Sequence, residues 1–376
     1  MLRLYYTFEP PAAALIQRKL LDPHPNHLSF CSILLGNLLS PFMPASFWAL
    51  QRVCVFVSAV TLLALTGCAG SKRTDIGHTL RTEVPAPEGS PQIIAAYQPW
   101  FGRSGHIDVG YNSQDPGVLA EQVDHAKDLN IKAFVVNWYG PSHDFEDRSY
   151  AELQRISSQH DFKTAVMYDE SVDDPSRATE QAISDLQYAY EHYIGPKASV
   201  PPTAYLSYDG RPMIFIFPKS GDTDWKRVKQ AVSGWEHPPI LIYEDEDAKD
   251  WGAFDGYYAW VSPGRKGWLK DGSNWGRSYL ENFYSRMSKQ TDKLAIGAAW
   301  PGFDDSKAEW GQDRKMDARC GKTLQDSLNL HRRYFPADRP LPFLMIVTWN
   351  DYEEGTAIER GIANCGKNDG TQRAGG

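Results

Sequence analysis

The sequence lacks the motifs of several common chemistries. Its 376 residues contain no G-x-S-x-G nucleophile elbow and no H-E-x-x-H zinc helix, and its 10 histidines are scattered. Residues 361–367 have the glycine and lysine spacing of a P-loop, but Asn368 stands where Ser or Thr would bind magnesium. No helix is expected to follow, so we interpret this stretch as a loop. These absences argue against serine-esterase, zinc-protease and nucleotide-binding chemistry.

Runs of positive charge are also lacking. The chain carries 39 Lys and Arg against 47 Asp and Glu, a net charge of −8, and no basic run occurs in the part expected to fold. Because phosphate binding needs clustered Lys and Arg, nucleic acid is not an expected partner. Aromatic residues, in contrast, are plentiful at 12%, with 12 Trp and 19 Tyr. Most should fill a core, but Trp and Tyr also suit stacking against sugar rings.

The apolar run at residues 53–65 is too short for a comfortable membrane span and has about the length of a signal-peptide core. Arg52 flanks it with positive charge. It ends in Leu-Thr-Gly-Cys at 65–68, which resembles the bacterial lipobox, where the Cys is lipidated and becomes the mature N-terminus. The alternative is a short buried helix that ends in Gly-Cys. We expect residues 43–67 to be a lipoprotein signal peptide and Cys68 to carry lipid. The protein would then be exported and anchored to a bacterial membrane, facing the periplasm or cell surface, through the lipid alone.

The flanking segments complete the predicted organisation. Residues 1–42 are rich in Pro and Leu, unlike a signal n-region, so we expect Met43 to be the true start; a disordered extension is the alternative. Residues 68–91 are polar with Pro, Gly and Ser and should form a tether. Among the 5 cysteines, Cys320 and Cys365 remain after processing and lipidation. Export makes a disulfide possible, and we predict that these two pair.

Residues 92–376 alternate between two patterns, short apolar or β-branched runs and longer amphipathic stretches. About eight strands with helices between them predict a single-domain (β/α)₈ TIM barrel of the α/β class. An open doubly wound sheet is disfavoured, because no Gly-rich fingerprint follows the first strand. The last helix should be short or missing, because the chain after Glu359 is turn-rich. Predicted strands are 93–98, 133–138, 164–168, 213–217, 240–243, 256–261, 294–299 and 343–349; predicted helices are 116–129, 149–159, 175–193, 224–233, 279–290 and 323–334.

The strongest functional signal follows the last predicted strand, where residues 348–356 read TWNDYEEGT. In a barrel, carboxylates just past the C-terminal end of a strand face the active-site mouth. Glycosidic cleavage commonly needs two of them, a protonated acid for the leaving oxygen and a second group that removes a proton or attacks. A solvated acidic turn is the simpler alternative. Trp349 and Tyr352 argue against it, because exposed aromatics are unfavourable unless they bind something.

The segment TWNDYEEGTAIE resembles the catalytic segment W-N-E-W-x-E-G-T-x-I-E of glycoside hydrolase family 99, the endo-α-mannosidases and endo-α-mannanases. It also resembles W-N-D-Y-x-E-S of family 71, the α-1,3-glucanases. The resemblance to family 99 spans roughly residues 92–360 and includes further fragments in the same order along the chain. These are YQPWFG at 97–102, GYNSQDP at 110–116, VVNWYGP at 135–141, GRPMIFIF at 210–217 and PGFDD at 301–305.

The resemblance implies roles for the two carboxylates. Glu354 matches the general acid of family 99, and Asp351 matches the carboxylate that deprotonates the sugar 2-hydroxyl to form a 1,2-anhydro sugar. Here Asp replaces the Glu of family 99 and is one methylene shorter, whereas in family 71 the Asp fits an inverting enzyme that activates water. Retaining or inverting chemistry, and mannoside specificity, therefore stay open. Glu353 occupies a variable slot and is expected to have a supporting or substrate-facing role at most.

Other residues are expected to bind substrate. Tyr97, Trp100, Asn137, Trp138 and Tyr139 lie at the ends of the first two predicted strands, where they should line the mouth and contact sugar rings. Packing beneath the loops is the alternative for each. Within the motif we expect Trp349, Asn350 and Tyr352 to contribute. Beyond it, Asp304 is the further substrate-binding prediction, with Asp305 beside it and with Asp169, Glu170 and Glu244 as additional polar candidates.

The sequence therefore predicts an endo-acting glycoside hydrolase for α-mannoside or α-glucan chains that needs no metal or organic cofactor. Its partners would be an oligo- or polysaccharide substrate and a membrane, and we expect a monomer. A glycosidase of another linkage, such as a xylosidase or arabinosidase, is one alternative. A lipoprotein that binds glycan without cleaving it is another, although a pure binder would not need an acid pair.

Overall fold

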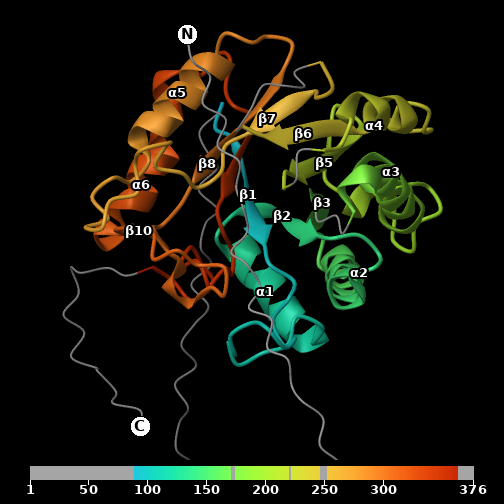
Figure 1. Cartoon of the computed structure of the whole chain (residues 1–376). Coiled ribbons are helices and arrows are strands. Elements are labelled where there is room, and N and C mark those ends of the chain that lie inside the picture. The colour runs from blue at the N-terminus through green and yellow to red at the C-terminus, as the bar shows by residue number, and fades with distance from the viewer. Residues whose placement is uncertain (1–88, 171–173, 220–221, 246–251, 363–376) are drawn as a thin grey trace, which may run out of the picture. The chain divides into compact units, whose positions relative to one another are not determined.

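The computed structural model describes residues 89–170, 174–219, 222–245 and 252–362 (Figure 1). The predicted extension 1–42, signal peptide 43–67, lipidation site Cys68 and almost all of the tether 68–91 lie outside these ranges. Within the described residues, no helix has both the length and the apolar character needed to cross a membrane.

Eight parallel strands close into a barrel. In chain order they are β1 (Gln92–Tyr97), β2 (Ile131–Trp138), β3 (Lys163–Asp169), β5 (Arg211–Phe217), β6 (Ile240–Glu244), β7 (Gly256–Tyr258), β8 (Leu294–Ala299) and β11 (Phe343–Ile346). Each pairs with the next, and β11 pairs with β1, which completes the ring. The short β4 (Ser207–Tyr208) runs antiparallel to β5. The (β/α)₈ fold and all eight predicted strands are confirmed.

Helices follow the strands and stand around the outside of the barrel (Figure 1). Helix α1 begins as predicted, because Asp115 caps it by accepting the N–H groups of Gly117 and Val118, and Pro116 is its first residue. The remaining helices match the predictions with shifted ends. The α-helices are α1 (Pro116–Asp128), α2 (Asp144–Gln159), α3 (Ala178–Ala189), α4 (Trp225–Val232), α5 (Arg277–Met287) and α6 (Lys322–Leu330).

Two predicted helices differ in extent from the observed ones. Helix α2 begins at Asp144 rather than at 149, and the additional turn contains three acidic residues, which the positive end of the helix dipole favours. The predicted helix 175–193 is divided in three, a 3₁₀ turn Pro175–Arg177, α3, and a π-helical turn Tyr190–Ile194. After β11, the described residues 347–362 form turns and no helix, in line with the predicted short or missing last helix.

The strands are buried almost throughout, as expected where helices cover one face and inward side chains fill the other. Because all eight barrel strands are parallel, their C-terminal ends lie at the same mouth of the barrel. The loop after β8 contributes a small antiparallel pair there, β9 (Phe303–Asp304) and β10 (Lys315–Met316). We call residues 303–316 the β9–β10 segment.

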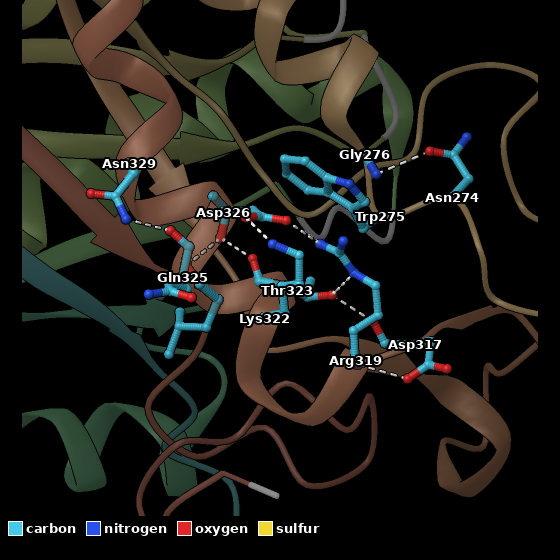
Figure 2. Close-up of polar contacts among 12 residues, drawn as sticks. Asn274, Trp275, Gly276, Asp317, Arg319, Lys322, Thr323, Gln325, Asp326 and Asn329 are labelled. Carbon is cyan, nitrogen blue, oxygen red and sulfur yellow. Dashed lines mark hydrogen bonds and ion pairs between the residues drawn. The ribbon is translucent and has the colours of Figure 1, made fainter. Parts of the chain in front are cut away.

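A polar network holds the start of α6 (Figure 2). The guanidinium of Arg319 donates to Asp326 Oδ2 at 2.9 Å and to Thr323 Oγ1 at 2.9 Å. These bonds fix a tight turn in which Cys320 has a φ of 56°. Cys320 is disulfide-bonded, whereas its predicted partner Cys365 lies outside the described residues.

Candidate active site

The 348–356 turn emerges from β11 and closes on itself. The Thr348 N–H donates to the carbonyl of Thr356 at 3.1 Å, and the two threonine hydroxyls are 3.0 Å apart. Gly355 has a φ of 64°, and a Cβ there would lie 3.2 Å from the backbone nitrogen of Asp304. Glycine is therefore required at this position by both the backbone conformation and the close approach of the β9–β10 segment.

Asp351 lies at the centre of this turn and is 2% exposed. Its Oδ1 accepts the backbone N–H groups of Glu353 at 3.1 Å and Glu354 at 2.9 Å. Its Oδ2 lies 3.4 Å from the amide nitrogen of Gln98, which follows β1. The carboxylate is thus held in one orientation by the backbone that carries the second acid.

Glu354 sits at the other side of the turn. Its Oε1 accepts the indole N–H of Trp310 at 3.0 Å. Its backbone carbonyl accepts the N–H of Asp304 at 2.8 Å. Both the side chain and the backbone of Glu354 are therefore in contact with the β9–β10 segment.

The pKa of each carboxyl group is raised. Burial is the largest cause at Asp351, and the negative charge of Glu354 adds to it, whereas the bonds from the backbone N–H groups lower that pKa. Burial also raises the pKa of Glu354, against the Trp310 bond, which lowers it. Two neighbouring carboxylates that are shielded from water and repel each other do not both ionise readily, so the pair holds a proton more tightly than exposed acids do. Such a pair can supply one acid and one base at the same pH.

The two carboxyl groups line a cleft of about 300 Å³ at the barrel mouth. Of the other predicted residues, Trp100, Asn137 and Tyr139 line it as well, and so does the additional polar candidate Asp169. Aromatic walls with polar groups between them are typical of sites that bind organic ligands through one apolar face and several hydroxyls. The full lining is Gln98, Trp100, Arg103, His106, Asn137, Tyr139, His143, Glu146, Asp169, Phe217, Lys219, Trp260, Trp310, Asp351 and Glu354.

Three predicted aromatic residues are buried away from the cleft. The hydroxyl of Tyr97 donates to Gln122 Oε1 at 2.8 Å on α1, and Trp138 Nε1 donates to Asp147 Oδ1 at 2.9 Å on α2. Trp349 has no exposed surface, and its ring centre lies 5.2 Å from that of Phe134. These side chains pack in the core, which was the alternative for Tyr97 and Trp138, and the substrate-binding prediction for Trp349 is wrong because its ring is fully buried.

The other three predicted residues do not line the cleft either. Asn350 joins the turn to β1 by accepting the Gln98 N–H at 2.7 Å and donating to the Gln98 carbonyl at 3.0 Å. The Tyr352 hydroxyl donates to Glu359 at 2.6 Å. The side chain of Asp304 is 46% exposed and caps the 3₁₀ turn that follows it. Asn350 and Tyr352 brace the turn, and Asp304 shapes the neighbouring segment.

Glu353, assigned little by the sequence, has well-defined partners. It is 1% exposed, and its two carboxylate oxygens lie 2.9 Å from His106 Nδ1 and 3.1 Å from the backbone nitrogen of Ile107. The ring of His106 stacks on Trp100, with centres 4.8 Å apart and planes at 10°. Glu353 therefore fastens the loop after β1 to the 348–356 turn, and Trp100 is positioned through it.

Several residues that line the cleft were not predicted from the sequence. Gln98 and Phe217 fall inside fragments of the family resemblance, and Trp260 falls inside a predicted strand, so a signal existed for them. Arg103, which pairs with Glu146, and Trp310 lie on loops whose path no periodicity encodes. Also missed were His106, His143 and Lys219.

No family model and no curated protein sequence matches the chain. Solved structures do. The GH99 endo-alpha-mannosidase from Bacteroides thetaiotaomicron is 18% identical, with a TM-score of 0.56 over 71% of this chain and 87% of that one. The chain shares the fold of family 99. A structure of the same enzyme in complex with BIS-TRIS-propane is 19% identical, with a TM-score of 0.56 over 71% of this chain and 86% of that one. A protein described as glycoside hydrolase-like is 14% identical, with a TM-score of 0.52 over 74% of this chain and 90% of that one.

Proposed function

We propose that this protein is a glycoside hydrolase that cuts within α-mannoside or α-glucan chains, with Glu354 as general acid and Asp351 as base. The observation that carries the proposal is the pair of carboxyl groups on one turn, Asp351 buried and Glu354 partly buried, that line an aromatic-walled cleft together. The shared fold with a GH99 endo-alpha-mannosidase supports it. So does the resemblance of residues 348–359 to the catalytic segments of families 99 and 71.

The surroundings of the two groups suit different roles. Burial raises the pKa of Asp351, and two backbone N–H bonds on one oxygen act against that rise and favour the ionised form that a base needs. Glu354 is partly buried, and its raised pKa favours the protonated form of an acid. Glu354 would give its proton to the leaving glycosidic oxygen as the bond to the anomeric carbon breaks. Asp351 would take a proton from water or from the sugar 2-hydroxyl, and the oxygen so freed attacks the anomeric carbon.

The cleft offers binding groups of the kind that sugars use. Trp100, Tyr139 and Trp260 present ring surfaces, and Asn137 presents an amide among them. Stacking on rings with hydrogen bonds to hydroxyls is how apolar sugar faces and polar edges are recognised together. The side chains come from several loops, so linkage specificity depends on loop geometry and is the finer part of the proposal.

The direct test incubates the purified protein with α-mannan and α-1,3-glucan and measures released reducing ends. Oligosaccharide products of mixed length would indicate internal cutting. An NMR time course of the anomeric signals then distinguishes a retaining from an inverting reaction. Glycan that binds without release of reducing ends would refute the proposal in favour of a binding protein. If reducing ends were released only from xylan or arabinan, the proposed specificity would change to that linkage.

Export with a lipid anchor at Cys68 is a separate proposal that rests on the sequence at 52–68. The protein would act as a monomer at the outer side of a bacterial membrane. Labelled palmitate should be incorporated into the wild type and not into the Cys68→Ala variant, and only the wild type should sediment with membranes. Equal labelling of both forms would contradict the assignment.

A further inference from the structure

Trp310 is an exposed aromatic residue at the rim of the cleft. It is 43% exposed, yet its indole N–H reaches Oε1 of Glu354 at 3.0 Å. Its ring meets two others edge-on, with centres 5.9 Å from Trp100 and 6.1 Å from His106. Trp310 therefore lines the cleft and contacts one of its two carboxyl groups at the same time.

An ion pair between the buried Asp305 and the partly exposed Arg314 holds the β9–β10 segment together around Trp310. Asp305 has no exposed surface, and it accepts both the backbone N–H and the Nε–H of Arg314 at 2.7 Å. The Arg314 guanidinium also lies over the rings of Trp268 and Phe303, at 5.3 and 5.2 Å. The loop that presents Trp310 is thus internally bonded, and the Asp304 N–H joins its start to the Glu354 backbone.

The chemistry of a carboxylic acid gives this contact a consequence. A protonated carboxyl group has one carbonyl oxygen and one hydroxyl oxygen, and an N–H donor is best accepted by the carbonyl oxygen. Because Trp310 donates to Oε1, the acidic proton of Glu354 belongs on Oε2. A group that delivers a proton needs that proton on a defined oxygen with a defined direction.

We propose that Trp310 is a positioning residue for the acid. Its indole N–H holds Oε1 so that Oε2 carries the proton delivered to the leaving oxygen, and its ring forms part of the wall that the sugar meets. This inference rests on the proposed function, and it assigns to the β9–β10 segment a part in proton transfer. It separates the two contributions of one side chain, the N–H and the ring.

Several charged groups face Glu354, and they define what the removal of the N–H should do. Arg314 on the β9–β10 segment and Lys219 after β5 lower the pKa of Glu354, Asp305 raises it, and the coupled carboxylate Asp351 lies on the same turn. The Trp310 bond also lowers that pKa. Loss of the N–H alone therefore raises the pKa of the acid while the surrounding charges stay the same.

The test compares Trp310→Phe, which keeps an aromatic ring and removes the N–H, with Trp310→Ala, which removes both. For Trp310→Phe we expect kcat to fall about tenfold with KM within about twofold, since roughly one hydrogen bond to the acid is lost. The alkaline limb of the kcat profile should move up by about one pH unit. Trp310→Ala should show the same shift and a raised KM in addition.

Trp260→Phe is the matched control, because Trp260 lines the same cleft from the segment after β7 and, within the described residues, makes no hydrogen bond to Glu354. Its KM should rise while its alkaline limb stays at the wild-type pH. A Trp310→Phe variant whose kcat and whose alkaline limb in the kcat–pH profile both equal those of the wild type would overturn the proposal. So would an equal limb shift in Trp260→Phe, since a general disturbance of the cleft would then account for both.

A second measurement does not depend on activity. In a ¹⁵N-labelled wild type, the indole resonance that disappears in Trp310→Phe should change its shift as Glu354 titrates, and this titration should be absent in Glu354→Gln. A resonance that stays fixed across the titration would overturn the contact itself. If the resonance titrates while no glycan is cleaved, the contact stands and the proposed function fails.

Discussion

Two acidic pairs lie at the barrel mouth on neighbouring loops, Asp351 with Glu354 and Asp304 with Asp305. The sequence places both just beyond a strand end, yet they have opposite surroundings. Asp305 is fully buried and bonded to the Arg314 guanidinium, and Asp304 is half exposed with a pKa lowered by its bond to Ser306. Asp351 is buried and Glu354 is partly buried on the same turn, and the pKa of each is raised. Position at a strand end therefore marks a candidate, and the partner of each carboxylate decides whether it is reactive or structural.

Among substitutions in the two acidic pairs, Glu354→Gln is expected to have the largest effect on kcat. It removes the proton donor and keeps the shape and the acceptor for Trp310, so kcat should fall about 10³-fold. Circular dichroism and thermal melting should show a fold at least as stable as the wild type. Undiminished turnover in this variant would refute the assignment of the acid.

Asp351→Asn should reduce kcat by about 10²–10³-fold and stabilise the fold at pH 7. The folded-state pKa of Asp351 is raised, so its contribution to stability is present below the unfolded pKa, near 4, and is lost as the pH rises. Asn remains neutral and can still accept the backbone N–H groups.

We expect its melting temperature to exceed that of the wild type by about 2–4 °C at pH 7, which corresponds to roughly 1 kcal/mol. The difference should shrink at pH 4. A variant that melts below the wild type at pH 7 would show that the Asp351 charge stabilises the native state.

Asp305→Asn should weaken the structural pair instead. It leaves Arg314 without its anionic partner, at a cost of about 1–3 kcal/mol in the free energy of unfolding. Displacement of the β9–β10 segment should also reduce kcat, because Trp310 loses its position. Chemical denaturation and kinetics measured together check this, and a variant with unchanged stability would contradict the role of the pair.

The smallest effect is expected at Asp304. Asn at this exposed N-cap keeps the bond to Ser306, so stability should change by no more than about 0.5 kcal/mol. The lowered pKa of Asp304 contributes stability above its unfolded pKa, and this small contribution is lost as the pH falls through the folded one. A large rise in KM in Asp304→Asn would restore the substrate-binding role that its sequence position suggested.

The barrel was predictable because each strand is a short apolar run and each helix an amphipathic one, and these periods survive in the sequence. The same local reasoning found the 348–356 turn. It failed for Tyr97 and Trp138, because alternation along a strand directs a side chain inward or outward and a residue at a strand end can be directed to either side. It also missed Trp310, which reaches Glu354 from 44 residues away through a loop without periodicity.

Closure of the ring between its first and last strands has a consequence for the order of folding. The Trp349 N–H donates to the Ala96 carbonyl at 2.7 Å, and Asn350 bonds to Gln98 across 252 positions of sequence. The acid pair thus takes its final geometry only after the C-terminal strand has been made and has docked beside β1, a contact of very high sequence separation. A growing or truncated chain that ends before β11 lacks the acid pair, so the proposed activity would appear only with the last strand.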